Sequence, residues 1–165
     1  MYIRRKEELK NWITTNKHRV SLTTDIWVAQ VTGANDMVIF FSLHVIDRNW
    51  HLKKLIIGFK NVSDHKGETI STVLLECLAD WGIEKVFCIT VDNATANTSA
   101  LKKFRRAFNL GSDEAFVFDG KFLHMRCCAH IINLIAKEGL ADLCENVNAI
   151  RNAIVYVSSS EAAGF

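Results

Sequence analysis

Two aspartates stand at places where an acidic side chain could do chemistry. Asp92 directly follows the apolar run from Val86 to Val91, whose β-branched and aromatic residues are typical of a buried parallel strand. Asp25 lies in a second apolar stretch, Leu22 to Val28. Ligands of open α/β sheets gather outside the carboxyl ends of strands, and carboxylate oxygens are the ligands that Mg²⁺ or Mn²⁺ prefers. We therefore expect Asp25 and Asp92 to form a pair that binds a divalent cation.

A structural explanation of Asp92 competes with the catalytic one. An isolated aspartate at the end of a strand commonly caps the next helix, and Asp92 or Thr95 would suit that role. The presence of a second acid in a similar setting favours the catalytic interpretation.

Cys127 and His130 have the C-x-x-H spacing of half a zinc site. Structural zinc needs four protein ligands, and catalytic zinc needs three and a water, but no second pair of ligands completes the set. A packed cysteine beside a hydrogen-bonded histidine is the other interpretation of these two residues taken on their types alone.

Composition indicates one globular domain. The chain has 165 residues, of which 49% are hydrophobic and 23% charged, enough to bury a sizeable core. No apolar run approaches the roughly 18 residues of a membrane span, and the amino terminus lacks the apolar segment of a signal peptide. The five cysteines have no disulfide-framework spacing, so we expect reduced thiols in an intracellular protein.

The net charge of +2 excludes the field of a strongly basic nucleic-acid binder. Basic residues instead form two clusters, between residues 4 and 19 and between residues 102 and 106. Each cluster could simply be a solvated helix face.

The hydrophobic pattern predicts a defined order of elements. A period of two predicts the first strands, and a period of 3.6 predicts the helices. Residues 2–15 read as a leader helix with too few apolar positions for firm burial. The strands are expected at 20–28, 37–46, 50–59, 86–91, 115–118 and 122–126, and the helices at 70–81, around 101–108, from about 127, and at 140–157.

This order is that of the ribonuclease-H-like α/β fold. We expect a mixed sheet of about five strands, three antiparallel and then parallel, with the Asp25 strand central and beside the Asp92 strand. Helices should cover both faces, and the fold should be incomplete at its carboxyl end. The expected domains are a leader or linker helix at 1–18, the first part of the core at 19–140, and a further helix at 141–165.

Several segments resemble the plant hAT transposase superfamily, including its domesticated relatives with a BED zinc finger. They include Arg19 to Trp27, Thr90 to Asn97 and, most specifically, His124-Met-Arg-Cys-Cys-Ala-His-Ile-Ile-Asn-Leu134. The resemblance runs from about residue 10 to residue 157.

The resemblance implies a core that cuts and joins DNA in the nucleus with an Asp, Asp, Glu triad and Mg²⁺ or Mn²⁺. Asp25 matches the first acid and Asp92 the second, as catalytic and metal-binding residues. Arg126, Cys127 and His130 match a motif associated with the DNA end near the cleavage site. The third acid of the family is a glutamate that follows a helical insertion domain. The helix at 141–165 leads toward that domain, at whose start this chain stops. The family oligomerises through a later region. We therefore expect the parent, but not this piece alone, to be active.

Two other functions stay open. A domesticated relative would keep the fold for DNA binding or protein assembly without catalysis. An unrelated nucleotide-binding α/β domain is disfavoured, because no glycine-rich phosphate loop follows a strand.

Overall fold

The computed structural model describes residues 2–29, 36–109, 111, 114–141 and 144–158. The chain forms two compact units, a first that ends at Cys127 and a second that begins at Cys128. This division falls before the domain boundary expected at residue 140, and that boundary stays a prediction.

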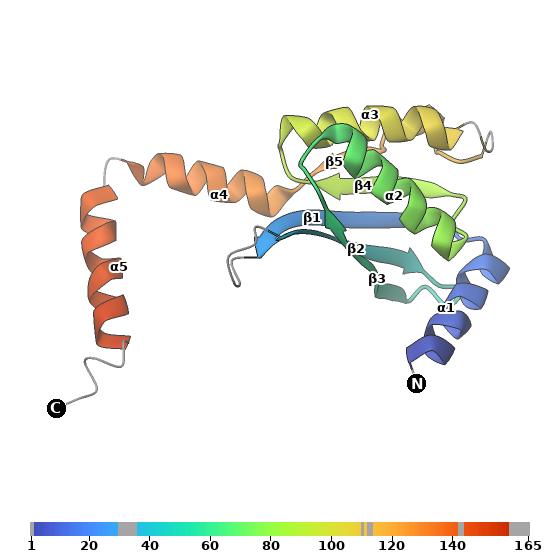
Figure 1. Cartoon of the computed structure of the whole chain (residues 1–165), viewed down its shortest axis with the longest axis horizontal. Helices are drawn as coiled ribbons and strands as arrows, with labels where there is room; N and C mark the ends of the chain where they lie inside the picture. Colours follow the sequence, from blue (N-terminus) through green and yellow to red (C-terminus); the bar gives the residue numbers. More distant parts are fainter. Residues whose placement is uncertain (1, 30–35, 110, 112–113, 142–143, 159–165) are drawn as a thin grey trace. The chain divides into compact units, whose positions relative to one another are not determined.

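A five-stranded sheet in the order β3-β2-β1-β4-β5 forms the centre of the first unit (Figure 1). β1 is antiparallel to β2 and β2 to β3, whereas β1 and β4, and β4 and β5, are parallel. The strands are β1 Val20–Ala29, β2 Asp36–Ile46, β3 Leu52–Val62, β4 Val86–Val91 and β5 His124–Arg126. The predicted mixed sheet is confirmed, with the Asp25 strand central and the Asp92 strand beside it.

Three long helices belong to the first unit and two to the second. In the first unit they are α1 Tyr2–Asn16, α2 Gly67–Trp81 and α3 Thr95–Asn109; in the second, α4 Cys128–Gly139 and α5 Cys144–Ser158. α2 is closed by Gly82, which has a left-handed backbone (φ 63°) and donates its N–H to the carbonyls of Leu78 and Ala79.

Two expected elements differ in the structure. The short strand expected at 115–118 is a turn that leads into the single-turn helix η1, Phe118–Gly120, although the Ala115 carbonyl still accepts a hydrogen bond from the Val86 N–H at 2.9 Å. The helix expected at 140–157 begins at Cys144, and part of its expected start, residues 142–143, lies outside the described residues.

The two faces of β1 have different surroundings, as its alternation predicted. Val20, Leu22 and Thr24 are buried, and they define what we call the covered face of the sheet. The hydrophobic core on this side also includes residues of α1, α2 and α3, and from the other strands Ile39, Phe41, Leu43 and Val45 of β2 and Ile89 and Val91 of β4. We call the opposite side, with Ser21, Thr23, Asp25 and Trp27 of β1, the Asp25 face.

The helices of the first unit therefore cover one of the two faces on which helices were predicted. Within that unit the Asp25 face is exposed at Asp25, Trp27, Ile56 and Phe59.

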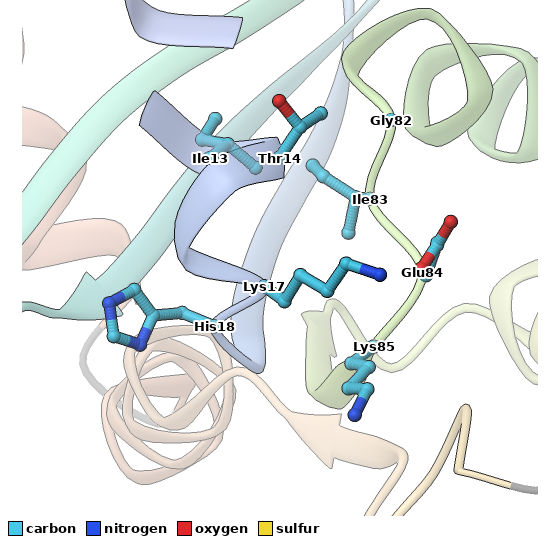
Figure 2. Close-up of a pocket in the computed structure, with 8 residues that line it drawn as sticks. All are labelled: Ile13, Thr14, Lys17, His18, Gly82, Ile83, Glu84 and Lys85. Carbon is cyan, nitrogen blue, oxygen red and sulfur yellow. The ribbon is translucent and has the colours of Figure 1, made fainter. Parts of the chain in front are cut away.

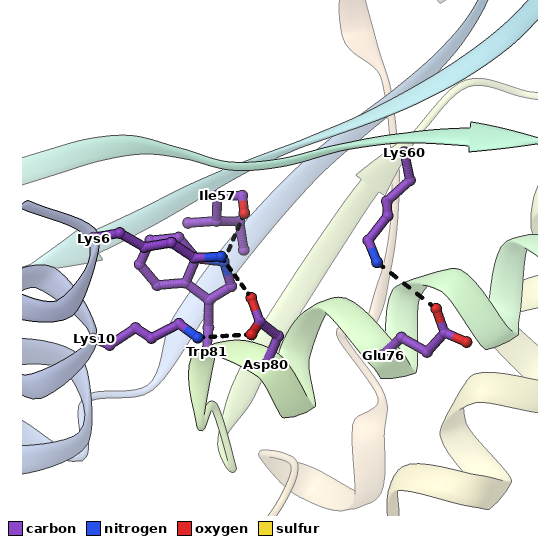
Figure 3. Close-up of polar contacts among 7 residues, drawn as sticks. All are labelled: Lys6, Lys10, Ile57, Lys60, Glu76, Asp80 and Trp81. Carbon is purple, nitrogen blue, oxygen red and sulfur yellow. Dashed lines mark hydrogen bonds and ion pairs between the residues drawn. The ribbon is translucent and has the colours of Figure 1, made fainter. Parts of the chain in front are cut away.

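α1 packs on the core of the first unit, more firmly than its few apolar positions suggested; the boundary expected at residue 18 stays a prediction. Ile13 is buried, and Leu9 and Trp12 pack on the core. Lys6 and Lys10 bind the Asp80 carboxylate at 3.1 and 2.6 Å, above the ring of Trp81 (Figure 3). The aliphatic stems of lysines can cover apolar surface while their ammonium groups stay paired, so α1 needs fewer apolar residues than its sequence suggested.

Candidate functional site

The two candidate acids belong to adjacent parallel strands. Asp92 directly follows β4, and Asp25 lies within β1, two residues after Thr23, where the pairing of β1 with β4 ends. The register of β1 and β4 pairs Leu22 with Ile89 and Thr23 with Thr90. Asp25 and Asp92 each come two residues after Thr23 and Thr90, so continuing this register sets them level with each other on the Asp25 face. Neighbouring strands are separated by about 4.8 Å, a spacing at which two carboxylates can share cations.

Asp92 is oriented by the turn that leads into α3. Its Oδ1 accepts hydrogen bonds from the Ala94 N–H at 2.8 Å and from the side-chain amide of Asn97 at 2.6 Å. Asn97 is buried in the first turn of α3, so it holds this carboxylate firmly. The same two bonds are those expected of an acid that stabilises a helix start, so both interpretations of Asp92 have a structural basis.

Asp25 is exposed and bordered by aromatic rings. Its Oδ1 accepts the N–H of Ile26 at 2.9 Å. Phe40 of β2 pairs with Asp25, and Phe59 of β3 pairs with Phe40, with the two ring centroids 6.2 Å apart. Trp27, the next residue of β1 on this face, is 56% exposed.

Arg126 and Cys127 reach the same edge of the sheet through β5. Arg126 pairs with Val91, and the Cys127 N–H donates to the Val91 carbonyl at 2.8 Å. Arg126 is exposed and Cys127 half-buried. Four of the five predicted site residues thus lie toward the same end of the sheet: Asp25, Asp92, Arg126 and Cys127. Because Arg126 pairs with Val91, which is buried on the covered face, Arg126 belongs to the covered side of β5 and not to the Asp25 face.

His124, at the start of β5, also belongs to this region. Burial, and secondly the charge of Arg126, lower the pKa of its imidazole below the usual value. This histidine favours the neutral form, which adds no positive charge beside Arg126.

His130, the fifth predicted residue, lies in the first turn of α4 and is half-buried in the second unit. In the part of the chain that the structure describes, no group of three or more histidine, cysteine or acidic side chains is arranged to hold a metal. The half zinc site therefore has no partner there. The two carboxylates have the oxygen donors that Mg²⁺ or Mn²⁺ prefers, but they form only part of a coordination shell.

Arg19 has a structural role that sequence reasoning missed. Its guanidinium donates to the carbonyls of Glu114 at 2.8 Å, Ala115 at 3.0 Å and Val86 at 3.3 Å. Lys85 pairs with the Glu114 carboxylate, and this hydrogen bond is the main cause of the lowered pKa of Glu114. These contacts tie the segment before η1 to the amino end of β4. An arginine just before a strand is the only local signal, because its partners lie far along the chain.

A pocket of about 140 Å³ lies at this opposite end of the strands (Figure 2). Ile13, Thr14, Lys17 and His18 line it from the end of α1 and the start of β1, and residues 82–85 line it from the connection into β4. These residues precede β1 and β4, whereas Asp25 lies within β1 beyond its pairing with β4 and Asp92 follows β4. The pocket is therefore not part of the acid site.

Comparison with known families agrees with this architecture. The family model of the ZBED1 RNase-like domain matches residues 23–122, and that of the ZBED1 RNase-like helical domain matches residues 125–164. The chain belongs to the ZBED1 RNase-like domain family.

Its sequence relatives connect it to the hAT-type transposases. The "Putative AC transposase" of Zea mays is 34% identical over 97% of this chain and 20% of its own length. "Zinc finger BED domain-containing protein RICESLEEPER 3" of Oryza sativa subsp. japonica is 25% identical over 97% of the chain and 21% of its length. "Zinc finger BED domain-containing protein DAYSLEEPER" of Arabidopsis thaliana is 25% identical over 84% of the chain and 19% of its length. The chain is thus related to hAT-type transposases and spans about a fifth of the length of these relatives.

A chain of a solved structure, "CryoEM structure of simian T-cell lymphotropic virus intasome in complex with PP2A regulatory subunit B56 gamma", matches 88% of this chain and 42% of its own length, with 15% identity and a TM-score of 0.39. A likeness this distant carries no argument.

Among the described residues, no helix has the length and apolarity needed to cross a bilayer.

Proposed function

We propose that this chain is the amino-terminal part of the catalytic core of a hAT-type DNA transposase, which in its complete form cleaves and transfers DNA strands in the nucleus. The observation that carries the proposal is the parallel register of β1 and β4, which pairs Thr23 with Thr90 and, continued by two residues, would set Asp25 level with Asp92. The relationship to a putative transposase at 34% identity supports it.

In this proposal Asp25 and Asp92 hold Mg²⁺ or Mn²⁺. Such an ion, when bound, would help to activate the attacking water and neutralise charge on the phosphodiester. Asn97 fixes one oxygen of Asp92 and so limits the positions of the other. Arg126 attracts the phosphate backbone at the same edge, and Cys127 and His130 contact the DNA end.

The proposal assigns the third acid to a glutamate beyond residue 165. Phosphoryl transfer depends almost entirely on positioning and electrostatic stabilisation, and a misplacement of about 1 Å can lower the rate about a hundredfold. Two carboxylates leave a cation less firmly placed than three. We therefore expect this chain alone not to cleave DNA.

A second candidate is a domesticated relative that binds DNA or assembles with proteins and does not catalyse. The two hydrogen bonds to Oδ1 of Asp92 favour it, because a residue kept only to stabilise the start of α3 would make the same bonds.

Metal binding tests the site directly. Titration of the chain with Mn²⁺, followed by electron paramagnetic resonance, should show one weak site that Asp25→Asn and Asp92→Asn each abolish. Glu84→Gln, which removes an exposed acid at the opposite end of β4, is the matched control and should bind Mn²⁺ as the parent sequence does. Equal binding by all four proteins would contradict the acid pair.

Cleavage tests the function. The short chain and a version extended through the downstream glutamate are incubated with Mn²⁺ and a matched transposon-end duplex. We expect nicking by the extended chain only, and its loss in the extended chain with Asp92→Ala. Nicking by the short chain that depends on Asp92 would overturn the expected need for a third acid. Metal binding without nicking by the extended chain would favour the domesticated relative.

A further inference from the structure

Three phenylalanine rings form a continuous exposed strip at the amino end of β4. The ring centroids of Phe87 and Phe122 are 6.1 Å apart, and those of Phe122 and Phe118 are 6.0 Å apart. Phe87 is 42%, Phe122 38% and Phe118 74% exposed. Other phenylalanines of the same region, such as Phe104 and Phe116, are buried, so the exposure of this strip is not a general property of the segment.

The turn that presents Phe118 has an unfavourable backbone. Phe118 (φ 47°) and Asp119 (φ 54°) are both in the left-handed region and are followed by Gly120 (φ 77°). Bulky residues rarely adopt this conformation, and such strain persists where surrounding structure enforces it, often at functional sites. The strain is not compensated by burial of the Phe118 side chain.

Surrounding contacts hold this turn in place. The Gly120 N–H donates to Val117 at 3.0 Å, and the Leu123 N–H donates to Gly120 at 3.1 Å. Gly120 and Leu123 are buried. The exposed rings therefore stand on a fixed support rather than on a loose loop.

Basic side chains border the strip. The ammonium group of Lys121 lies 5.7 Å from the centroid of the Phe122 ring. Arg105 of α3 packs against the turn, since a Cβ added at Gly120 would lie 3.1 Å from its Nε. Arg105 also lines, with Lys102 and Arg106, an open hollow on α3. Asp119 is the acidic residue within the turn itself, so positive charge predominates beside the rings.

We propose that this strip binds single-stranded DNA. Aromatic side chains on which bases stack, beside cations that follow the phosphates, are the features with which proteins bind single strands without sequence preference. Here Phe118 and Phe122 would stack the bases, and Lys121, Arg105 and the α3 hollow would bind the backbone. The choice of DNA over RNA rests on the function proposed above.

This surface is separate from the acid pair. Phe87 precedes Asp92 by five residues of an extended strand, which corresponds to about 16 Å. Single-stranded DNA bound on the rings would lie at the opposite end of β4 from the proposed cleavage site and would leave that site free.

The test measures fluorescence anisotropy of a labelled twelve-nucleotide oligo(dT) with the whole chain, at low salt and with EDTA. Because the buffer removes divalent ions, the result does not depend on metal binding at the acid pair, and failure here is distinguishable from failure of the transposase proposal. Phe118→Ala and Phe122→Ala should each weaken binding at least about fivefold, the lower range for loss of one stacked base. Phe118→Tyr, which keeps a ring, should bind like the parent sequence.

Phe59→Ala is the matched control, because it removes a ring whose exposure, 60%, lies between those of Phe122 and Phe118, from β3 at the other edge of the sheet. It should leave the affinity unchanged. Arg105→Ala should weaken binding and make it less sensitive to salt, because fewer counterions are released. Unchanged binding by Phe118→Ala, an equal loss with Phe59→Ala, tighter binding of oligo(rU), or an equal effect on a blunt duplex would each overturn the proposal.

Discussion

The two faces of the sheet differ: one packs into the hydrophobic core of the first unit, and the other carries the exposed candidate acid Asp25. On the covered face, Leu22, Phe41, Leu43 and Ile89 are inaccessible to solvent and pack against the helices of the first unit. On the Asp25 face, β1 presents Thr23, Asp25 and Trp27, of which Asp25 and Trp27 are exposed.

This difference shows how one alternating pattern serves two purposes. Successive side chains of a strand point to opposite faces, so every second residue can be chosen for packing without constraining its neighbours. Residues next to each other in sequence should therefore respond very differently to the same substitution.

The largest expected effect compares two adjacent phenylalanines of β2. Phe41 is completely buried on the covered face, and Phe40 is half-buried on the Asp25 face. Phe41→Ala should lower the free energy of unfolding by about 3–5 kcal/mol, the usual cost of removing a buried phenylalanine. Phe40→Ala should cost about 1 kcal/mol, because much of its ring already contacts water. Urea unfolding measures both, and equal losses would contradict the difference between the faces.

The next effect concerns Cys77 of α2, which packs on the covered face. Its Sγ lies 3.2 Å from where a Cβ on Gly58 would be, and burial raises the pKa of its thiol to about 11. A raised pKa in the folded state means that stability is fully present below the unfolded value, near 9, and is lost as pH rises toward 11. The expected loss is up to about 3 kcal/mol. Thermal unfolding between pH 8 and 11 measures it.

Cys77→Ala is the control for this alkaline loss, since it removes the titrating group. Its stability should change less between pH 8 and 11 than that of the parent sequence. In native protein at pH 8, iodoacetamide should modify Cys77 more slowly than Cys88, which lies on the Asp25 face opposite Ser21. Equal rates would show that the covered face opens readily.

Local patterns explain why much of the fold was predictable. The period of two in residues 20–28 separated the faces of β1, and the same period predicted the next two strands, which form the antiparallel part of the sheet. The lengths of strands and turns led to the meander, and the fold order then placed the two acids on neighbouring strands.

The contacts that sequence reasoning missed join residues far apart in the chain. Asp80 binds α1 about seventy residues away, and Arg19 binds carbonyls some 95 residues away. No local period records such pairs. Residues 115–118, expected to form a strand, are a turn that leads into η1, because hydrogen bonding within the turn and the left-handed residues Phe118 and Asp119 prevent extension. The placement of Asp25 and Asp92 on neighbouring strands was predictable from the order of elements, and their pairing around a cation stays a prediction. The contact from Asn97 that orients Asp92 was not predictable.

A smaller effect compares the two acids with each other. Asp92→Asn should destabilise the first unit by about 1 kcal/mol, because a charged acceptor at the start of α3 is lost. Asp25→Asn should change the free energy of unfolding by less than about 0.5 kcal/mol, since Asp25 is exposed and bonds only its neighbour's N–H among the described contacts. Urea unfolding at neutral pH compares them. An equal cost for both would show that Asp25 also has a structural role.

The smallest expected effect concerns Asp64, whose carboxylate accepts hydrogen bonds at the start of α2, a helix that packs on the covered face. Asp64 precedes α2, and its Oδ1 accepts hydrogen bonds from the Thr69 hydroxyl at 2.7 Å and the Lys66 N–H at 3.0 Å. The Thr69 bond first, and then the bonds from Lys66, lower the pKa of Asp64 to about 2. A lowered pKa in the folded state means that this stabilisation is present above the unfolded value, near 4, and is lost as pH falls toward 2.

Asp64→Asn should therefore lower the melting temperature slightly at pH 6, and the difference from the parent sequence should shrink as pH falls from about 4 to 2. Because Asp64 is at the surface, solvent and salt screen its interactions, so the effect should be smaller than that of Asp92→Asn. Thr69→Val, which removes the hydroxyl donor but keeps the shape of the side chain, should reproduce part of the loss at pH 6. A difference that stays constant between pH 6 and pH 2 would show that Asp64 acts through the shape of its turn and not through its charge. The start of α2 would then depend, like the covered face, on packing alone.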